Sequence, residues 1–203
     1  MPRPKTLNPR HAAIKNYYKT LAELRSQNVA NESALRPAFQ NLLAESARLH
    51  GWTLIPELST ESRGRTVIPD GTVRDGNDLP RGYWEAKDSA DNLEAEIAKK
   101  IQRGYPTSNI IFEDTQQAIL YQDKREVLRA DLANPLQLAD LVNLFHTHVE
   151  PEIETFEKAI EEFKDRVPGL GAGPPGTVTG FWAIAWISPR PSGQNPVTVP
   201  QAA

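Results

Sequence analysis

Two carboxylates and a lysine occupy positions where a buried strand would carry apolar side chains. Asp70 lies in Ile-Pro-Asp-Gly, and Glu85 and Lys87 flank an alanine in Tyr-Trp-Glu-Ala-Lys. Alternate side chains of a strand share one face, so we expect Glu85 and Lys87 to be neighbours. If the two strands pair through the loop over 74–82, Asp70 also comes close to Glu85.

This set of side chains predicts a particular chemistry. Two carboxylates at short range repel each other unless a cation lies between them, and such an oxygen-rich pair suits Mg²⁺. An ammonium group beside the metal can orient an attacking water, while the metal polarises a phosphoryl oxygen and stabilises the leaving oxyanion. Asp70, Glu85 and Lys87 therefore predict magnesium-dependent phosphodiester hydrolysis. The alternative is a surface salt bridge of Glu85 with Lys87 or Arg74 on a solvated sheet face.

The elements that position these residues follow from apolar periodicity and from glycine and proline punctuation. The predicted fold class is α/β, a mixed central sheet flanked by helices, because helices and strands do not alternate regularly. Pro37 fits its helix only near the first turn or at a kink, and the Pro-Asp step interrupts the second strand. In chain order we predict helices over 12–26 and 33–49, strands over 52–58, 66–73 and 83–89, a helix over 90–104, strands over 109–114 and 118–123, and helices over 135–149 and 151–167.

Length and composition set the domain organisation. The 203 residues carry a net charge of -3, which does not by itself indicate nucleic-acid binding. A net negative charge does not exclude a DNA enzyme, because a divalent metal can neutralise its carboxylates. We predict a basic N-terminal helix within 1–30, a core over 31–149, an acidic helix within 150–170 and a Pro/Gly-rich, disordered tail over 171–203. No cysteine is present, which excludes disulfides and thiolate zinc sites and fits a cytoplasmic protein. No stretch approaches the ~20 apolar residues of a membrane span.

At the level of motifs, Pro69-Asp70 with Glu85-Ala86-Lys87 resembles the signature of the PD-(D/E)xK nuclease superfamily. A longer set of segments resembles the N-terminal nuclease region of type ISP and related single-polypeptide restriction-modification enzymes. These segments are ALRPAFQNLL (34–43), IPDGTV (68–73), YWEAKD (83–88), KKIQRGYPTSNIIFED (99–114) and AILYQD (118–123).

The resemblance implies a role for each matching position. Asp70 and Glu85 would bind Mg²⁺ with the carbonyl of Ala86 as a third ligand, and Lys87 would serve the nucleophilic water. Glu32 is the candidate for a further catalytic acid on the first core helix, or else it only favours the helix dipole. DNA phosphates would be contacted from the helix after the motif by Lys99, Lys100, Gln102 and Arg103, unless this face is merely solvated and pairs with Glu96.

The chain departs from those large enzymes in one respect. It has neither a Gly-x-x-x-x-Gly-Lys-Ser/Thr loop nor an Asn-Pro-Pro-aromatic motif, so motor, methyltransferase and recognition domains are expected elsewhere. We therefore expect a DNA endonuclease module of a prokaryotic restriction-modification system, for which DNA rather than RNA is implied by the resemblance alone. The rivals are a DNA-binding module without catalysis and an interaction protein that docks a partner through its helices.

Overall fold

The computed structural model describes residues 6–28, 32–89, 92–149 and 159–160, with only the backbone of Glu32. The chain divides into two compact units, Met1–Thr155 and Phe156–Ala203. In the second unit only Ala159 and Ile160 are described, and both are helical. The rest of the helix predicted over 151–167 and the tail over 171–203 lie outside the described residues. Within the described part, no helix is long and apolar enough to cross a membrane.

Two packed helices open the first unit. Helix α1 (Ala12–Ser26) has the predicted bounds and is capped by His11, whose ring Nδ1 accepts a hydrogen bond from the Ala13 N–H. Helix α2 (Glu32–Leu49) begins one residue before the predicted start, and Pro37 lies in its second turn. The helices meet where Tyr17 packs edge-to-face on Phe39, with ring centres 6.0 Å apart.

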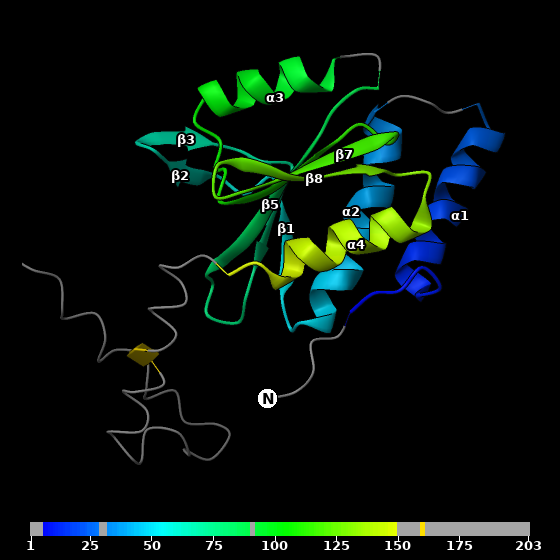
Figure 1. Ribbon diagram of the computed structural model, residues 1–203, viewed down its shortest axis with the longest axis horizontal. Helices are drawn as coiled ribbons and strands as arrows, with labels where there is room; N and C mark the ends of the chain where they lie inside the picture. Colours follow the sequence, from blue (N-terminus) through cyan, green and yellow to red (C-terminus); the bar gives the residue numbers. More distant parts are fainter. Residues whose placement is uncertain (1–5, 29–31, 90–91, 150–158, 161–203) are drawn as a thin grey trace, which may run out of the picture. The chain divides into compact units, whose positions relative to one another are not determined.

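A six-stranded mixed sheet forms the centre of the unit (Figure 1). Its order is β1-β4-β5-β6-β7-β8. Only β5 and β6 run parallel, because helix α3 (Leu93–Gln102) provides the crossover that a parallel pair needs. The strands are β1 (Thr53–Pro56), β4 (Gly71–Arg74), β5 (Pro80–Ala86), β6 (Asn109–Glu113), β7 (Gln117–Gln122) and β8 (Arg125–Asp131).

The strand predicted over 66–73 is in fact two strands in two sheets. Strand β3 (Arg65–Val67) pairs with β2 (Thr60–Ser62) as a small hairpin, and the chain enters the main sheet only at β4. Residues 68–70 belong to neither ladder, since Pro69 cannot donate a ladder hydrogen bond. The predicted interruption at the Pro-Asp step is therefore confirmed, but it is a change of sheet and not a local break.

Three further predictions need correction. Strand β8 was not predicted, because it is an edge strand with mostly exposed and partly charged residues and lacks an apolar pattern. Strand β2 was missed because it is three residues long and exposed or half-buried. The strand predicted over 83–89 begins three residues earlier and ends at Ala86, so Lys87 lies just beyond it.

The helices divide between the two faces of the sheet, as Figure 1 shows. Trp84, Ile111 and Leu120 pack with α1, α2 and helix α4 (Pro135–Thr147) in the larger core. Tyr83, Ile110 and Phe112 pack with Leu93 and Ile97 of α3 in the smaller one. Both faces of β5 and β6 are buried, and neighbouring side chains of each strand enter different cores. The predicted α/β class with a mixed sheet flanked by helices is confirmed.

Candidate active site

Asp70 lies at the point where the chain passes from the small hairpin into β4. Its Oδ2 accepts a hydrogen bond from the backbone N–H of Ala86 at 2.8 Å, so it contacts the end of β5 directly. Its Oδ1 pairs with Nη1 of Arg36 on α2, also at 2.8 Å. The carboxylate is thereby fixed between the neighbouring strand and the first core helix.

Glu85 is placed by β5 on the α3 side of the sheet and is almost fully buried, with 3% of its side chain exposed. Its Oε1 lies 2.8 Å from Nζ of Lys87 and also contacts Nζ of Lys100. Its Oε2 is buried and has no hydrogen-bond partner among the described residues. Buried carboxylate oxygens are normally satisfied, so this oxygen is available to a ligand.

The predicted approach of Asp70 to Glu85 is present and has an electrostatic consequence. Burial raises the pKa of Asp70, and the negative charge of Glu85 raises it further. The Ala86 N–H, Arg36 and Lys87 act in the opposite direction. Two half-buried or buried carboxylates therefore share this site, and basic side chains offset part of their repulsion.

Lys87 follows β5 and is held at both ends. Its backbone N–H donates to the carbonyl of Glu113 on β6 at 2.7 Å, and its ammonium group pairs with Glu85. Because 12% of the Lys87 side chain and 3% of the Glu85 side chain are exposed, this pair does not lie on a solvated sheet face. That location argues against the surface salt bridge considered from the sequence.

Glu113 is a third acid near this site that the sequence did not single out. It stands opposite Ala86 in the parallel ladder, but its side chain enters the larger core, where Trp84 Nε1 and the Thr115 N–H donate to it at 3.3 and 2.7 Å. Burial raises its pKa to about 8. At neutral pH Glu113 is therefore mostly uncharged, and its neutral side chain is a weak candidate for a metal ligand.

The sequence did not show that three basic or aromatic residues lie beside the motif carboxylates. Arg36 bridges Asp70 and Glu57, Lys100 contacts Glu85 from the α3 side, and Tyr105 accepts a hydrogen bond from Lys100. Lys100 was grouped with the surface lysine Lys99 because both follow the motif on one helix. No local pattern in the sequence distinguishes them, since their environments depend on how α3 packs on the sheet.

The remaining predicted positions are distributed as follows. Glu32 is the first residue of α2, and its side chain lies outside the described residues. Lys99 pairs with Glu96 at 2.5 Å, as the solvated-face alternative has it, and Gln102 and Arg103 are exposed at the end of α3. DNA contacts by this helix stay a prediction.

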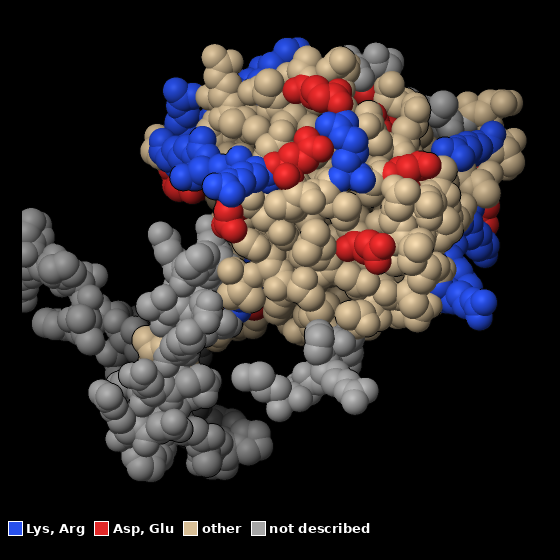
Figure 2. Space-filling model, in the orientation of Figure 1, with Lys and Arg blue, Asp and Glu red and all other residues tan. Residues whose placement is uncertain are grey.

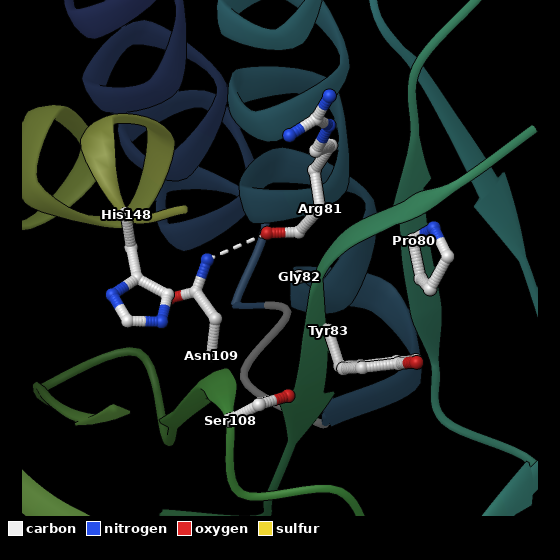
Figure 3. A pocket seen from close by; sticks show the side chains of 7 residues that line it. All are labelled: Pro80, Arg81, Gly82, Tyr83, Ser108, Asn109 and His148. Carbon is white, nitrogen blue, oxygen red and sulfur yellow. Dashed lines mark hydrogen bonds between the residues drawn. The ribbon is translucent and has the colours of Figure 1, made fainter. Parts of the chain in front are cut away.

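A small cavity lies at the opposite end of β5 from Glu85 (Figure 3). It is bordered by Arg81, Gly82, Asn109 and His148 among others, and Asn109 Nδ2 donates to the Arg81 carbonyl at 2.7 Å across it. Its volume of about 10 Å³ is room for a single water. None of the three motif residues lines it.

The residues present fit a magnesium ion. The described residues include no group of three or more histidine, cysteine or acidic side chains that could hold a metal. Mg²⁺ needs fewer, because it binds through one or two carboxylates and keeps several waters. The buried, unpartnered Oε2 of Glu85 beside Asp70 matches that requirement.

Comparison with known proteins supports the fold class. No protein-family model and no curated protein matches the chain. The cryo-EM structure of a DrdV–DNA complex is 42% identical with a TM-score of 0.68, covering 78% of this chain. The chain spans only 16% of the length of DrdV. A crystal structure of a putative nuclease belonging to DUF820 from Anabaena variabilis is 15% identical over 49% of this chain and 66% of its own, with a TM-score of 0.37. The fold is restriction-endonuclease-like.

Proposed function

We propose that this chain is the nuclease module of a prokaryotic restriction-modification system and hydrolyses DNA phosphodiester bonds with Mg²⁺. The observation that carries the proposal is the meeting of Asp70, Glu85 and Lys87 at one end of β4 and β5, with a buried carboxylate oxygen left without a partner. The similarity to a protein seen in complex with DNA supports DNA as the substrate.

Each residue has a role that follows from its contacts. Asp70 and Glu85 would hold Mg²⁺, with the Ala86 carbonyl as a further candidate ligand, and the bound ion would supply Lewis-acid stabilisation of the phosphoryl oxygens. Lys87 would position the attacking water and face the negative charge that develops at phosphorus. Arg36 favours the ionised form of Asp70 and holds this carboxylate in place through its 2.8 Å contact.

A basic edge formed by the β2–β3 hairpin and the β7–β8 turn offers a surface for DNA phosphates. Arg65 Nη1 donates to the Gln102 carbonyl at 3.0 Å and Arg63 Nη2 to the Thr107 hydroxyl at 2.9 Å, so the β2–β3 hairpin lies against the end of α3. Figure 2 shows basic side chains gathered where Figure 1 places this hairpin and the β7–β8 turn. The exposed residues of this edge are Arg63, Arg65, Arg103, Lys124 and Arg125. Phosphate contacts of this kind would hold DNA without reading its sequence.

The proposal extends to the whole protein in one respect. Because the chain spans a small part of DrdV, we infer that methyltransferase, recognition or motor functions belong to other domains or subunits. We also propose that the chain is related to the N-terminal nuclease region of type ISP restriction-modification enzymes. The module would then provide cleavage, and its partners would provide sequence specificity.

The test compares matched loss-of-charge variants in cleavage of supercoiled plasmid. Asp70→Asn removes a proposed metal ligand, whereas Asp78→Asn makes the same chemical change at an exposed turn residue. We expect Asp70→Asn to lose cleavage at least 100-fold and Asp78→Asn to behave as wild type, with equal circular dichroism. Equal cleavage by Asp70→Asn and wild type would reject the site.

A further inference from the structure

Lys100 lies deeper than a lysine that only contacts phosphates. Its ammonium group contacts Oε1 of Glu85 and donates to the Tyr105 hydroxyl at 3.0 Å, and it lies 4.5 Å from the centre of the Tyr105 ring. Its side chain is 16% exposed, against 61% for Lys99. Helix α3 therefore directs one lysine into the carboxylate pair while the preceding residue faces solvent.

Tyr105 connects Lys100 to the segment that carries Asp70. Its hydroxyl donates to the carbonyl of Ile68 at 2.9 Å, two residues before Asp70. A hydroxyl has one proton to donate, so toward Lys100 it acts as an acceptor and suits an ammonium group. A lysine that pairs with a carboxylate and donates to a hydroxyl is charged at neutral pH, so Lys100 is an ammonium group at this position.

The two carboxylates thus face three resident cations. Lys87 and Lys100 share one oxygen of Glu85, and Arg36 pairs with one oxygen of Asp70. Each positive charge near these oxygens weakens the binding of a divalent cation by like-charge repulsion. At the same time, Lys100 fixes the Oε1 side of Glu85 and leaves Oε2 without a partner.

We propose that Lys100, held by Tyr105, is a positioning residue that opposes metal binding by its charge and orients Glu85 for turnover. This inference rests on the proposed function. Lys100 would set the Mg²⁺ concentration at which the site works, whereas Lys87 would act on the water. Removing Lys100 should therefore tighten metal binding and slow cleavage, two changes that loss of packing alone does not produce together.

The experiment measures Mg²⁺ binding to the full chain by calorimetry, and plasmid cleavage at saturating Mg²⁺. We expect Lys100→Met to bind Mg²⁺ about three- to tenfold more tightly and to cleave at least tenfold more slowly. Lys100→Arg, which restores the charge, should return the affinity toward that of wild type. The matched control is Lys19→Met, which removes an exposed lysine paired with Glu23. It should leave both values unchanged.

Tyr105→Phe provides a second variant, since it keeps a ring in the smaller core and removes only the hydroxyl. It should bind Mg²⁺ more tightly and cleave more slowly than wild type, as Lys100→Met does, but by smaller factors. If Lys100→Met does not fold, Tyr105→Phe is the variant that tests the role of Lys100. Unchanged Mg²⁺ affinity in folded variants would overturn the role of Lys100 and leave the nuclease proposal intact. A wild-type chain that binds neither Mg²⁺ nor Mn²⁺ would overturn the metal site itself.

Discussion

Glu113 gives the sharpest prediction about stability, because its titration is shifted into the physiological range. Burial raises its pKa from the usual 4.5 to about 8. Between these values the folded state keeps the proton and the unfolded state has lost it, so the stability contributed by Glu113 falls as pH rises through this window. Integrated over the window, the loss is on the order of 4 kcal/mol.

The perturbation is Glu113→Gln, which is similar in shape and uncharged at every pH. Its side-chain oxygen can still accept one of the hydrogen bonds now donated by Trp84 and Thr115. We expect the variant to be close to wild type at pH 5 and to gain on it by up to about 1.4 kcal/mol per pH unit toward pH 8. Other titrating groups contribute equally to both proteins and cancel in the difference.

The assay is urea unfolding at pH 5, 6, 7 and 8 with EDTA, followed by circular dichroism. Glu23→Gln, an exposed glutamate on α1, is the control for the chemical change alone. A constant difference between Glu113→Gln and wild type across this range would refute the reasoning. It would mean that Glu113 is ionised in the folded protein at neutral pH.

Three further predictions test other parts of the account. Burial lowers the pKa of His146 to about 3, so the stability that His146 contributes falls as pH drops from 6.5 and opposes the contribution of Glu113; His146→Gln should therefore gain on wild type as pH drops below 6.5 in the same unfolding assay. Gly82→Ala should cost about 1–3 kcal/mol in thermal or urea unfolding, because its Cβ would come within 2.5 Å of the Phe145 ring. Arg63→Gln with Arg65→Gln should weaken DNA binding several-fold in fluorescence anisotropy and reduce the salt dependence by about one to two phosphate contacts; an unchanged salt slope would remove the hairpin from the interface.

The sequence was sufficient where local signals were strong. Helix α1 shows a clear apolar stripe, and the helix predicted over 90–104 from the spacing of Leu93, Ile97 and Ile101 contains α3. The motif residues were found because charge at buried strand positions is costly and needs a reason. Their convergence required only that β4 and β5 pair through a short loop.

The sequence was insufficient where tertiary packing decides. Strand β8 at the exposed edge and the short β2 carry too few apolar residues to be recognised. Arg36 and Lys100 are ordinary helix residues until α2 and α3 pack on opposite faces of the sheet and bring them to Asp70 and Glu85. The burial that shifts Glu113 is likewise a property of the folded core.

The most direct test of the central claim is plasmid cleavage by the folded chain in Mg²⁺ and in EDTA, with wild type and Lys87→Ala side by side. The account predicts nicking or linearisation that requires Mg²⁺ and is lost in Lys87→Ala, while both proteins keep the same circular dichroism and bind Mg²⁺. Cleavage that persists in EDTA, or equally in Lys87→Ala, would contradict a metal-dependent site built on Asp70, Glu85 and Lys87.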